Sequence, residues 1–413
     1  MPDWRNAIDS WIDSHVERIR DIRRHLHAHP EPSREEYQTT RFLAERLSET
    51  GVPFSIVPSR RGILAGSLDD VSGPLVAIRA DVDALRIADA KDVSYRSTLD
   101  GVMHACGHDA HAAMCLGASE ALWACREVLP TSCSWRAIFQ PAEEVGEGAH
   151  EMVAAGAMEG VKAVAALHVD PERPVGRVGC RARELTAFCH DLEVVVRGVG
   201  GHAARPHLAR DPLLAASQFL ATVYQAIPRN VDSREPTVVT FGSSRAGSSG
   251  NVIPEEVVLR GTIRTLSRAS SQRVAERLKQ VADGLGAATE TRFQVSLNHA
   301  TDGVFNDPAV TEVCTRAARE VVGPDKLDEI RLPSMGGEDF SGYLAHAPGC
   351  LMRLGVADPE GPTHHLHSPA FDIDEAALAL GARILARAVV LMALKFGRPA
   401  SPGTDAWDLR ADS

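Results

Sequence analysis

The stretch Pro74-Leu75-Val76-Ala77-Ile78-Arg79-Ala80 is a short and almost wholly apolar run, and Ser134-Trp135-Arg136-Ala137-Ile138-Phe139 is a second one. Apolar runs of this length are typical of strands that are buried on both faces. Residues 108–126, which lie between the two runs, have the pattern of a helix. Because strands that alternate with helices usually form parallel sheets, we expect an α/β core with a largely parallel sheet.

The length of the chain, 413 residues, exceeds what one hydrophobic core usually serves, so we expect two domains. Apolar residues at spacings near three and four predict an amphipathic helix over residues 4–27, closed by Pro30 and Pro32. A last helix is expected at about 374–397, and residues 398–413 have the composition of a frayed tail.

The pattern changes from Asp191 onward. We expect strands at 192–197, 237–242, 256–265 and 292–297, and helices at 212–227 and 270–285. The order strand, helix, strand, strand, helix, strand is that of the split βαβ or ferredoxin-like arrangement. The sequence therefore predicts that residues 187–300 form a separate α+β domain, inserted into a first domain made of residues 1–186 and 301–397.

Charge and hydropathy exclude several classes of protein. The formal net charge is −11 and is spread along the chain, which favours a soluble protein and gives no sign of nucleic-acid binding. Arg383, Arg387 and Lys395 interrupt the most apolar stretch, which predicts a packed helix and no membrane span. The N-terminal residues lack the apolar core and cleavage site of a signal peptide, so we expect a cytoplasmic protein.

Eight cysteines without any CxxC pattern argue against a disulfide framework, and most of them are expected to be buried free thiols. Cys106 differs, because residues 103–111 hold one thiol and three imidazoles. Cys106 and His108 are two residues apart, so a loop can aim both at one point, and Asp109 could orient an imidazole. This density favours a metal site, and a polar loop without a metal is the alternative.

A second cluster, Glu143-Glu144, directly follows the strand over residues 134–139. Loops after such strands carry ligands and catalytic groups. Two neighbouring carboxylates resist joint ionisation unless a cation or a proton holds one of them. We therefore expect one of the two carboxylates to be a metal ligand and the other to be a general base. The alternative is an acidic loop that is exposed to water.

Further polar residues follow other predicted strands. His168 ends an apolar run, Asp81 and Asp83 follow the first core strand, and residues 363–369 hold three histidines. A single histidine at a strand end is more often structural, and the aspartates could instead cap a helix or bind backbone amides. The case for metal ligands strengthens if several such strand ends meet at one edge of the sheet.

Seven motifs occur in order along nearly the whole chain. They are Arg79-Ala80-Asp81-Val82-Asp83-Ala84-Leu85, His104-Ala105-Cys106-Gly107-His108-Asp109, Ala142-Glu143-Glu144, Gly200-Gly201-His202-Ala203-Ala204-Arg205-Pro206-His207, Asn251-Val252-Ile253-Pro254, Gly261-Thr262-Ile263-Arg264-Thr265 and Glu338-Asp339-Phe340. The sequence resembles the amidohydrolase branch of the aminoacylase and carboxypeptidase metallopeptidase family, which includes hippurate hydrolases and auxin-conjugate hydrolases. Seven ordered motifs make a chance similarity implausible.

The resemblance implies a two-metal catalytic domain with an inserted lid or dimerisation domain at residues 187–300. It implies that a pair of divalent ions is bound, with Cys106 as the bridge, by Cys106, His108, Glu144, His168 and His367. Glu143 would be the general base and then the acid, and Asp83 would belong to the catalytic set. His202 would stabilise the oxyanion. Since the family resemblance suggests a homodimer formed through the inserted domains, we expect His202 to complete the partner's site.

Substrate contacts are expected from Asn251, Arg264 and Gly337. A guanidinium fork such as that of Arg264 is well shaped for a substrate carboxylate. The alternative for His202 and Asn251, which have glycine and proline neighbours, is turn chemistry. Two departures from the family pattern leave the substrate open: Arg86 stands where relatives usually have proline, and residues 243–250 are rich in Ser and Gly. We favour a solvated surface position for Arg86.

The expected reaction is hydrolysis of a small N-acyl or N-aroyl amino acid to a carboxylate and a free amino acid, by water activated between two cations. Alternatives on the same site are a dipeptidase or carboxypeptidase, or an enzyme that releases an amine from an aromatic substrate. A metal-binding protein without turnover is the alternative from another class, although a mere binder has no need of a base such as Glu143. The mixed sulfur, nitrogen and oxygen ligands suit zinc, manganese and cobalt alike.

Overall fold

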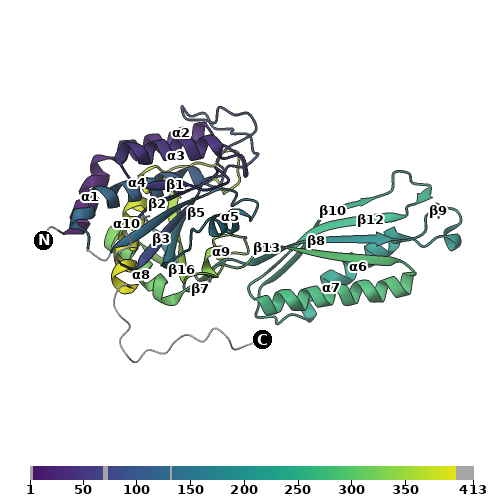
Figure 1. The fold of residues 1–413 in the computed structure, drawn as a ribbon. Coiled ribbons are helices and arrows are strands. Elements are labelled where there is room, and N and C mark those ends of the chain that lie inside the picture. Colours follow the sequence, from purple (N-terminus) through teal and green to yellow (C-terminus); the bar gives the residue numbers. More distant parts are fainter. Residues whose placement is uncertain (1–2, 68–72, 131–132, 397–413) are drawn as a thin grey trace, which may run out of the picture.

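The computed structural model describes residues 3–67, 73–130 and 133–396 and contains two bodies (Figure 1). The first is built around an eight-stranded mixed sheet, and the second around a four-stranded antiparallel sheet. The expected tail at 398–413 and the last residue of the expected C-terminal helix lie outside the described residues.

The large sheet has the spatial order β1-β2-β4-β3-β5-β16-β6-β15. Its strands are β1 (Phe54–Ile56), β2 (Ile63–Gly66), β3 (Leu75–Asp81), β4 (Ser134–Gln140), β5 (Val161–Pro174), β6 (Val178–Cys180), β15 (Leu327–Glu329) and β16 (Gly349–Ala357). A small ribbon pairs β7 (Arg183–Glu184) with β14 (Phe305–Asn306).

The centre of this sheet is parallel, as predicted, but its flanks are not. β4, β3, β5 and β16 run parallel. β1 and β4 are antiparallel to β2, and β6 is antiparallel to β16. Parallel neighbours need a crossover of about a dozen residues, whereas only residues 57–62 join β1 to β2. The expected largely parallel sheet is therefore a mixed sheet with a parallel centre.

Strand β3 is buried on both faces, which explains its continuous apolar run. Val76 and Ile78 belong to a core shared with α1, α2, α4 and α10, whereas Leu75 and Ala77 belong to a second core shared with α5 and α9. Helices thus cover both faces of the sheet. The bounds of the helices are α1 (Trp4–Ser14), α2 (Val16–Ala28), α3 (Tyr37–Thr50), α4 (His108–Ala124), α5 (Gly148–Ala154), α8 (Pro308–Val322), α9 (Ser341–Leu344) and α10 (Ala376–Phe396).

The N-terminal helix expected at 4–27 is two helices, because the chain breaks at His15. The Ser14 hydroxyl donates to the carbonyl oxygens of Ser10 and Trp11, and the His15 ring bonds the Trp11 carbonyl at 2.7 Å. Side chains that bind nearby carbonyls in this way compete with the helical ladder. The helix expected at 108–126 ends at Ala124 and is followed by a 3₁₀ turn at Arg126–Val128.

Helix α10 is the one helix in the described ranges that is long and apolar enough to cross a membrane. Its most apolar window has a mean hydropathy of 2.0, and 78% of that window is buried inside the fold. Arg387 on this helix lies 2.5 Å from Asp9 of α1 and 3.3 Å from Glu320 of α8. These contacts agree with the packed helix expected from the sequence.

The second body confirms the ferredoxin-like prediction. Its strands are β8 (Phe188–Arg197), β10 (Thr237–Ala246), β12 (Glu256–Thr265) and β13 (Arg292–Thr301), and its helices are α6 (Pro212–Ala226) and α7 (Arg268–Thr289). The order β10-β12-β8-β13 is that of a split βαβ sheet, and Phe219 of α6 and Leu278 of α7 pack into its core. The domain limits 187 and 300 stay a prediction, while the sheet itself starts at Phe188 and ends at Thr301.

A small antiparallel ribbon, β9 (Gly201–His202) with β11 (Val252–Ile253), lies at the end of the inserted domain that points away from the large sheet (Figure 1). Neither strand is predicted from the sequence pattern. Short 3₁₀ turns occur at Pro206–Leu208, Ile227–Arg229 and Pro324–Lys326. All eight cysteines are free, as expected.

Candidate metal centre

The predicted ligands gather where the parallel strands of the large sheet end. Glu143 and Glu144 follow β4, His168 lies within β5, and Cys106 and His108 flank the start of α4. Gly107 connects the last two in a left-handed conformation with φ +85°, and a Cβ atom there would lie 2.5 Å from the Val169 side chain. Only glycine suits this turn, which brings Cys106 and His108 to the same side.

The five predicted ligands form overlapping groups whose donor atoms lie within 4.8 Å of one another. One group holds Cys106, His108 and His168, and another holds Cys106, Glu144 and His367. The Cys106 sulfur lies 3.6 Å from Nε2 of His168, and Oε1 of Glu144 lies 3.6 Å from Nε2 of His367. The structure thus brings together residues that are 261 positions apart in sequence, counted from 106 to 367.

Hydrogen bonds on the far sides of the rings orient the ligand atoms. Nδ1 of His108 donates to the Asp83 carbonyl at 2.9 Å and lies 3.1 Å from the Asp83 carboxylate. Nδ1 of His168 donates to the Val169 carbonyl at 2.7 Å. Because backbone oxygens only accept, these partners assign the proton to Nδ1 and leave each Nε2 free to bind a metal.

Two atoms of the cluster are buried without a hydrogen-bond partner among the described residues. They are Nε2 of His108 and Oε1 of Glu144, which lie 3.9 Å apart. Buried polar atoms nearly always have a hydrogen-bond or ligand partner, so these two atoms are expected to bind one. Thiolate, imidazole and carboxylate are all ligands of divalent transition metals, and the residues present therefore fit a metal ion.

The electrostatics of the cluster also favour a cation. Burial raises the pKa of Glu143 well above its usual range, and the charges of Glu338 and Asp339 raise it further. Burial likewise raises the pKa of Glu144 and of the Cys106 thiol. These groups resist ionisation because they are buried among other acids, and a divalent cation would reverse that resistance.

The side chain of Glu143, the predicted base, lies next to the predicted metal ligands. Its Oε2 atom is 3.9 Å from Nε2 of His108, and it forms one donor group with His108 and Glu144. On its other side it is grouped with Glu338 and Asp339. A carboxyl group with a raised pKa next to a metal site can both accept and return a proton.

Asp83 was predicted to be catalytic, and the structure shows it in contact with His108. Its second carboxylate oxygen accepts hydrogen bonds from the Ser33 hydroxyl at 2.7 Å and from the Glu144 backbone amide at 3.0 Å. These three contacts orient a ligand ring and the acidic loop. A direct part in catalysis stays a prediction.

The sequence did not assign a role to Arg79, which is buried beneath the cluster. Its guanidinium lies 2.6 Å from Asp81, 2.7 Å from Asp339 and 3.1 Å from Glu338. It thereby holds the carboxylates that surround Glu143 and His108. An arginine inside an otherwise apolar run, visible at position 79 in the sequence, was the available signal.

His111, the third histidine near the start of α4, uses both ring nitrogens within the protein. Its Nδ1 lies 2.6 Å from Asp81, and its Nε2 accepts from the Val169 amide at 2.9 Å. This agrees with its absence from the predicted ligands. Asp109 does orient an imidazole, but that of His27 at 2.7 Å and not a ligand ring.

The residues predicted from the inserted domain are not in the cluster. His202 on β9 is exposed, and its Nδ1 accepts from the Ala204 amide at 3.0 Å. The Asn251 side chain accepts from the Ser249 hydroxyl at 2.6 Å. Both belong to the β9–β11 ribbon region at the far end of the domain (Figure 1).

Arg264 and Gly337 lie elsewhere, at the junction of the two domains. Arg264 donates to the Met335 carbonyl at 2.9 Å and lies 3.6 Å from the Cys189 sulfur. A Cβ atom on Gly337 would lie 3.2 Å from the same sulfur. The two predicted substrate contacts are therefore neighbours. Arg86 is exposed and pairs with Glu35, which agrees with a surface position.

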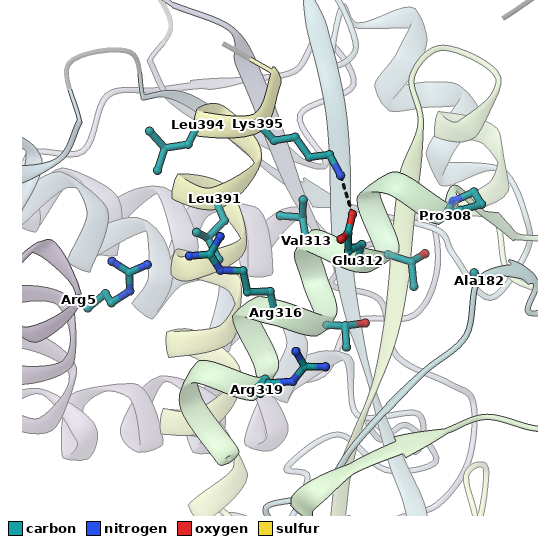
Figure 2. Close-up of a pocket in the computed structure, with 12 residues that line it drawn as sticks. Arg5, Ala182, Pro308, Glu312, Val313, Arg316, Arg319, Leu391, Leu394 and Lys395 are labelled. Carbon is teal, nitrogen blue, oxygen red and sulfur yellow. Dashed lines mark hydrogen bonds and ion pairs between the residues drawn. The ribbon is translucent and has the colours of Figure 1, made fainter. Parts of the chain in front are cut away.

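One cavity of about 480 Å³ adjoins the cluster, and it is lined by residues next to His168 and His367. A larger cavity of about 890 Å³ lies between α8 and α10 (Figure 2). Lys395 and Glu312 form an ion pair of 3.0 Å at its rim. None of the predicted site residues lines the larger cavity, so it carries none of this chemistry.

Comparison with known proteins agrees with this geometry. Residues 77–390 match the model of peptidase family M20/M25/M40. The chain is 38% identical over 358 residues to the N-acetyl-L-cysteine deacetylase of Bacillus subtilis (strain 168), covering 86% of this chain and 84% of that protein. It is 33% identical over 368 residues to the IAA-amino acid hydrolase ILR1-like 4 of Arabidopsis thaliana, covering 88% and 83%.

Among solved structures, the chain resembles the YXEP protein of Bacillus subtilis, described as a dinuclear metal-binding peptidase from the M20 family. The TM-score is 0.81 and the sequence identity is 32%. The match covers 92% of this chain and 99% of that chain.

Proposed function

This chain belongs to peptidase family M20/M25/M40 and is a metal-dependent hydrolase, and we propose that it cleaves the amide bond of N-acyl amino acids. The products would be a carboxylate and a free amino acid. The observation that carries this proposal is the position of Glu143, a buried carboxyl group of raised pKa beside a cluster of five metal ligands. The relatives named above act on N-acetylcysteine and on amino acid conjugates, which supports the same substrate class here.

We propose that the cluster holds two divalent ions. Cys106 is the member common to the group with His108 and His168 and to the group with Glu144 and His367, as a bridging ligand would be. When bound, such ions would lower the pKa of a water molecule and polarise the scissile carbonyl. Zinc, manganese and cobalt all suit this ligand set.

The residues around the site have separate roles in the proposed reaction. Glu143 accepts a proton from the attacking water and returns it to the nitrogen of the leaving amino acid. Asp83 holds the His108 ring in the orientation that directs Nε2 toward Glu144. Arg79 keeps Glu338 and Asp339 in place, and these two acids help to keep the pKa of Glu143 high enough for proton return.

The inserted domain is proposed to supply the oxyanion contact from a second subunit. Strand β9, which carries His202, lies at the end of the inserted domain that points away from the large sheet (Figure 1). β10 is an edge strand of the small sheet, and Leu213 and Leu214 at the start of the neighbouring α6 are about half exposed. An open strand edge beside exposed leucines is a surface suited to a homodimer. Asn251 and Arg264 are proposed to contact the substrate carboxylate.

A turnover screen tests the proposed function. The protein is reconstituted in turn with zinc, manganese and cobalt and supplied with N-acetyl, N-aroyl and dipeptide forms of the same amino acids. Release of the free amino acid from the N-acyl compounds, lost on chelation and regained with metal, is the expected result. Turnover of dipeptides alone would favour the dipeptidase alternative and contradict the proposal.

A further inference from the structure

Arg353 is a cation that lies next to a proposed metal ligand. It is on β16, directly opposite His168 of β5 in the parallel pairing of the two strands. Its side chain is half-buried, and it makes no hydrogen bond or ion pair with any residue in the ranges 3–67, 73–130 and 133–396. Neighbouring Arg173, by contrast, is 2.9 Å from Asp170 and 2.8 Å from Asp328.

Both arginines line the cavity of about 480 Å³ beside the cluster. The walls of this cavity include apolar Val169, Leu185 and Leu366. Val169 directly follows His168, and Leu366 directly precedes His367, so the cavity opens beside two proposed ligands. Its volume is within the usual range for a small-molecule site, about 300–1,000 Å³.

The charges around the cavity leave Arg353 available to a ligand. Asp170 is paired with Arg173, and Glu172 at the rim is exposed to solvent. A half-buried guanidinium without a partner keeps its full capacity to bind a carboxylate through two hydrogen bonds. A cavity that combines apolar wall residues with such a cation, on the strand next to His168, suits a short chain that ends in an anion.

We propose that Arg353 binds a carboxylate on the acyl group of the substrate, so that the substrates are N-acyl amino acids whose acyl part is a dicarboxylic acid, such as succinyl. This inference rests on the proposed function. The cavity is lined by residues of the first domain alone, whereas the predicted contacts for the amino acid carboxylate, Arg264 and Asn251, belong to the inserted domain. Hydrolysis adds water across the amide C–N bond and gives the dicarboxylic acid and the free amino acid.

The test compares two substrates that differ in one charge. N-succinyl-L-alanine and N-succinamoyl-L-alanine, in which a neutral amide replaces the acyl carboxylate, are supplied to the metal-loaded protein, and the ratio of their kcat/KM values is measured. Loss of a hydrogen-bonded ion pair lowers binding by about 10- to 100-fold, so the wild type should prefer the succinyl compound by that factor. The ratio is the readout because any general effect of a substitution near His168 cancels in it.

Three variants make the comparison specific. Arg353→Met should abolish the preference, mainly by raising KM for the succinyl compound, and Arg353→Lys should keep part of it because the charge remains without the fork. Arg177→Met is the matched control, since its guanidinium is paired with Asp328 and lies outside the cavity lining, and the ratio should stay that of the wild type. An unchanged ratio in Arg353→Met, or an equal loss in Arg177→Met, would overturn the proposal.

Two further arms separate this inference from the proposed function. If N-acetyl-L-glutamate and N-acetyl-L-glutamine, and not the succinyl pair, show the Arg353-dependent ratio, the cavity holds the amino acid side chain and the acyl assignment is wrong. Binding of the succinyl pair to Glu143→Gln protein by calorimetry decides the role of Arg353 without turnover. Preference for the charged compound there, with no hydrolysis of any N-acyl amino acid by the wild type, would refute the proposed function alone.

Discussion

The ligand cluster of the first domain and the β9–β11 ribbon of the inserted domain both carry polar side chains, but in opposite settings. In the cluster, His108 is fully buried and its Nδ1 is held by Asp83, so that Nε2 points at one place. On the ribbon, His202 is exposed, and its ring accepts a hydrogen bond from the Ala204 amide within its own turn. Electrostatic stabilisation of a developing charge is strong only where water is excluded. The cluster is therefore prepared within one chain, whereas the role proposed for His202 would require a second surface.

The largest decrease in kcat is expected when the general base is removed from the ligand cluster. Glu143→Gln keeps the shape of the side chain but removes the proton acceptor, so kcat should fall by roughly 10²–10⁴-fold while metal content stays unchanged. Metal analysis and turnover on the same samples measure this. A variant that keeps more than about a tenth of the wild-type kcat would show that Glu143 is not the base.

The second-largest expected effect tests whether the exposed β9–β11 ribbon takes part in catalysis. His202→Ala should lower kcat by roughly 10²–10³-fold, the usual cost of removing one oxyanion donor, without loss of metal or of the proposed dimer. Mixing this variant with Glu143→Gln should restore part of the activity, because one shared site in the mixed dimer would have both groups intact.

The control for this mixture is dilution until the dimer dissociates, which should abolish the restored activity. Subunit exchange is followed independently with differently tagged chains. If exchange occurs and the mixture stays as inactive as its parents, His202 does not act across the dimer, and the two regions are functionally separate.

The smallest effect concerns the hydrogen bonds that prepare the cluster. Asp83→Asn keeps the size of the side chain but weakens its hold on the His108 ring, and loss of such a contact lowers metal affinity by roughly 10- to 100-fold. Competition with a chromogenic chelator measures the metal Kd. Arg86→Ala serves as the control, because that exposed side chain pairs with Glu35 at the surface. Equal Kd values for wild type and Asp83→Asn would show that the Asp83 carboxylate does not contribute to metal binding.

Much of this molecule could be predicted from local patterns. The apolar run at 74–80 gave a central strand because alternate residues of β3 fill two cores. The ligand set followed from motifs and was brought together by the fold, although its roles stay predictions. The break at His15 was missed, since it depends on hydrogen bonds from Ser14 and His15 that compete with the helix. The antiparallel flanks of the sheet were missed because apolar composition does not encode strand direction.

The sequence by itself determined the central strands β3 and β4, the order of elements in the inserted α+β domain and the chemical nature of Cys106, His108, Glu143 and Glu144, because periodicity and side-chain chemistry are local properties. Only the tertiary structure decided what lies around them. It showed Arg79 among three carboxylates, the orphaned Nε2 of His108, and the distance of β9 from the cluster. It also placed Arg353 opposite His168, at a separation of 185 residues along the chain, counted from 168 to 353. Side chains become buried and acquire hydrogen-bond partners when segments that are distant in sequence pack together and exclude water. No single stretch of the sequence contains that information.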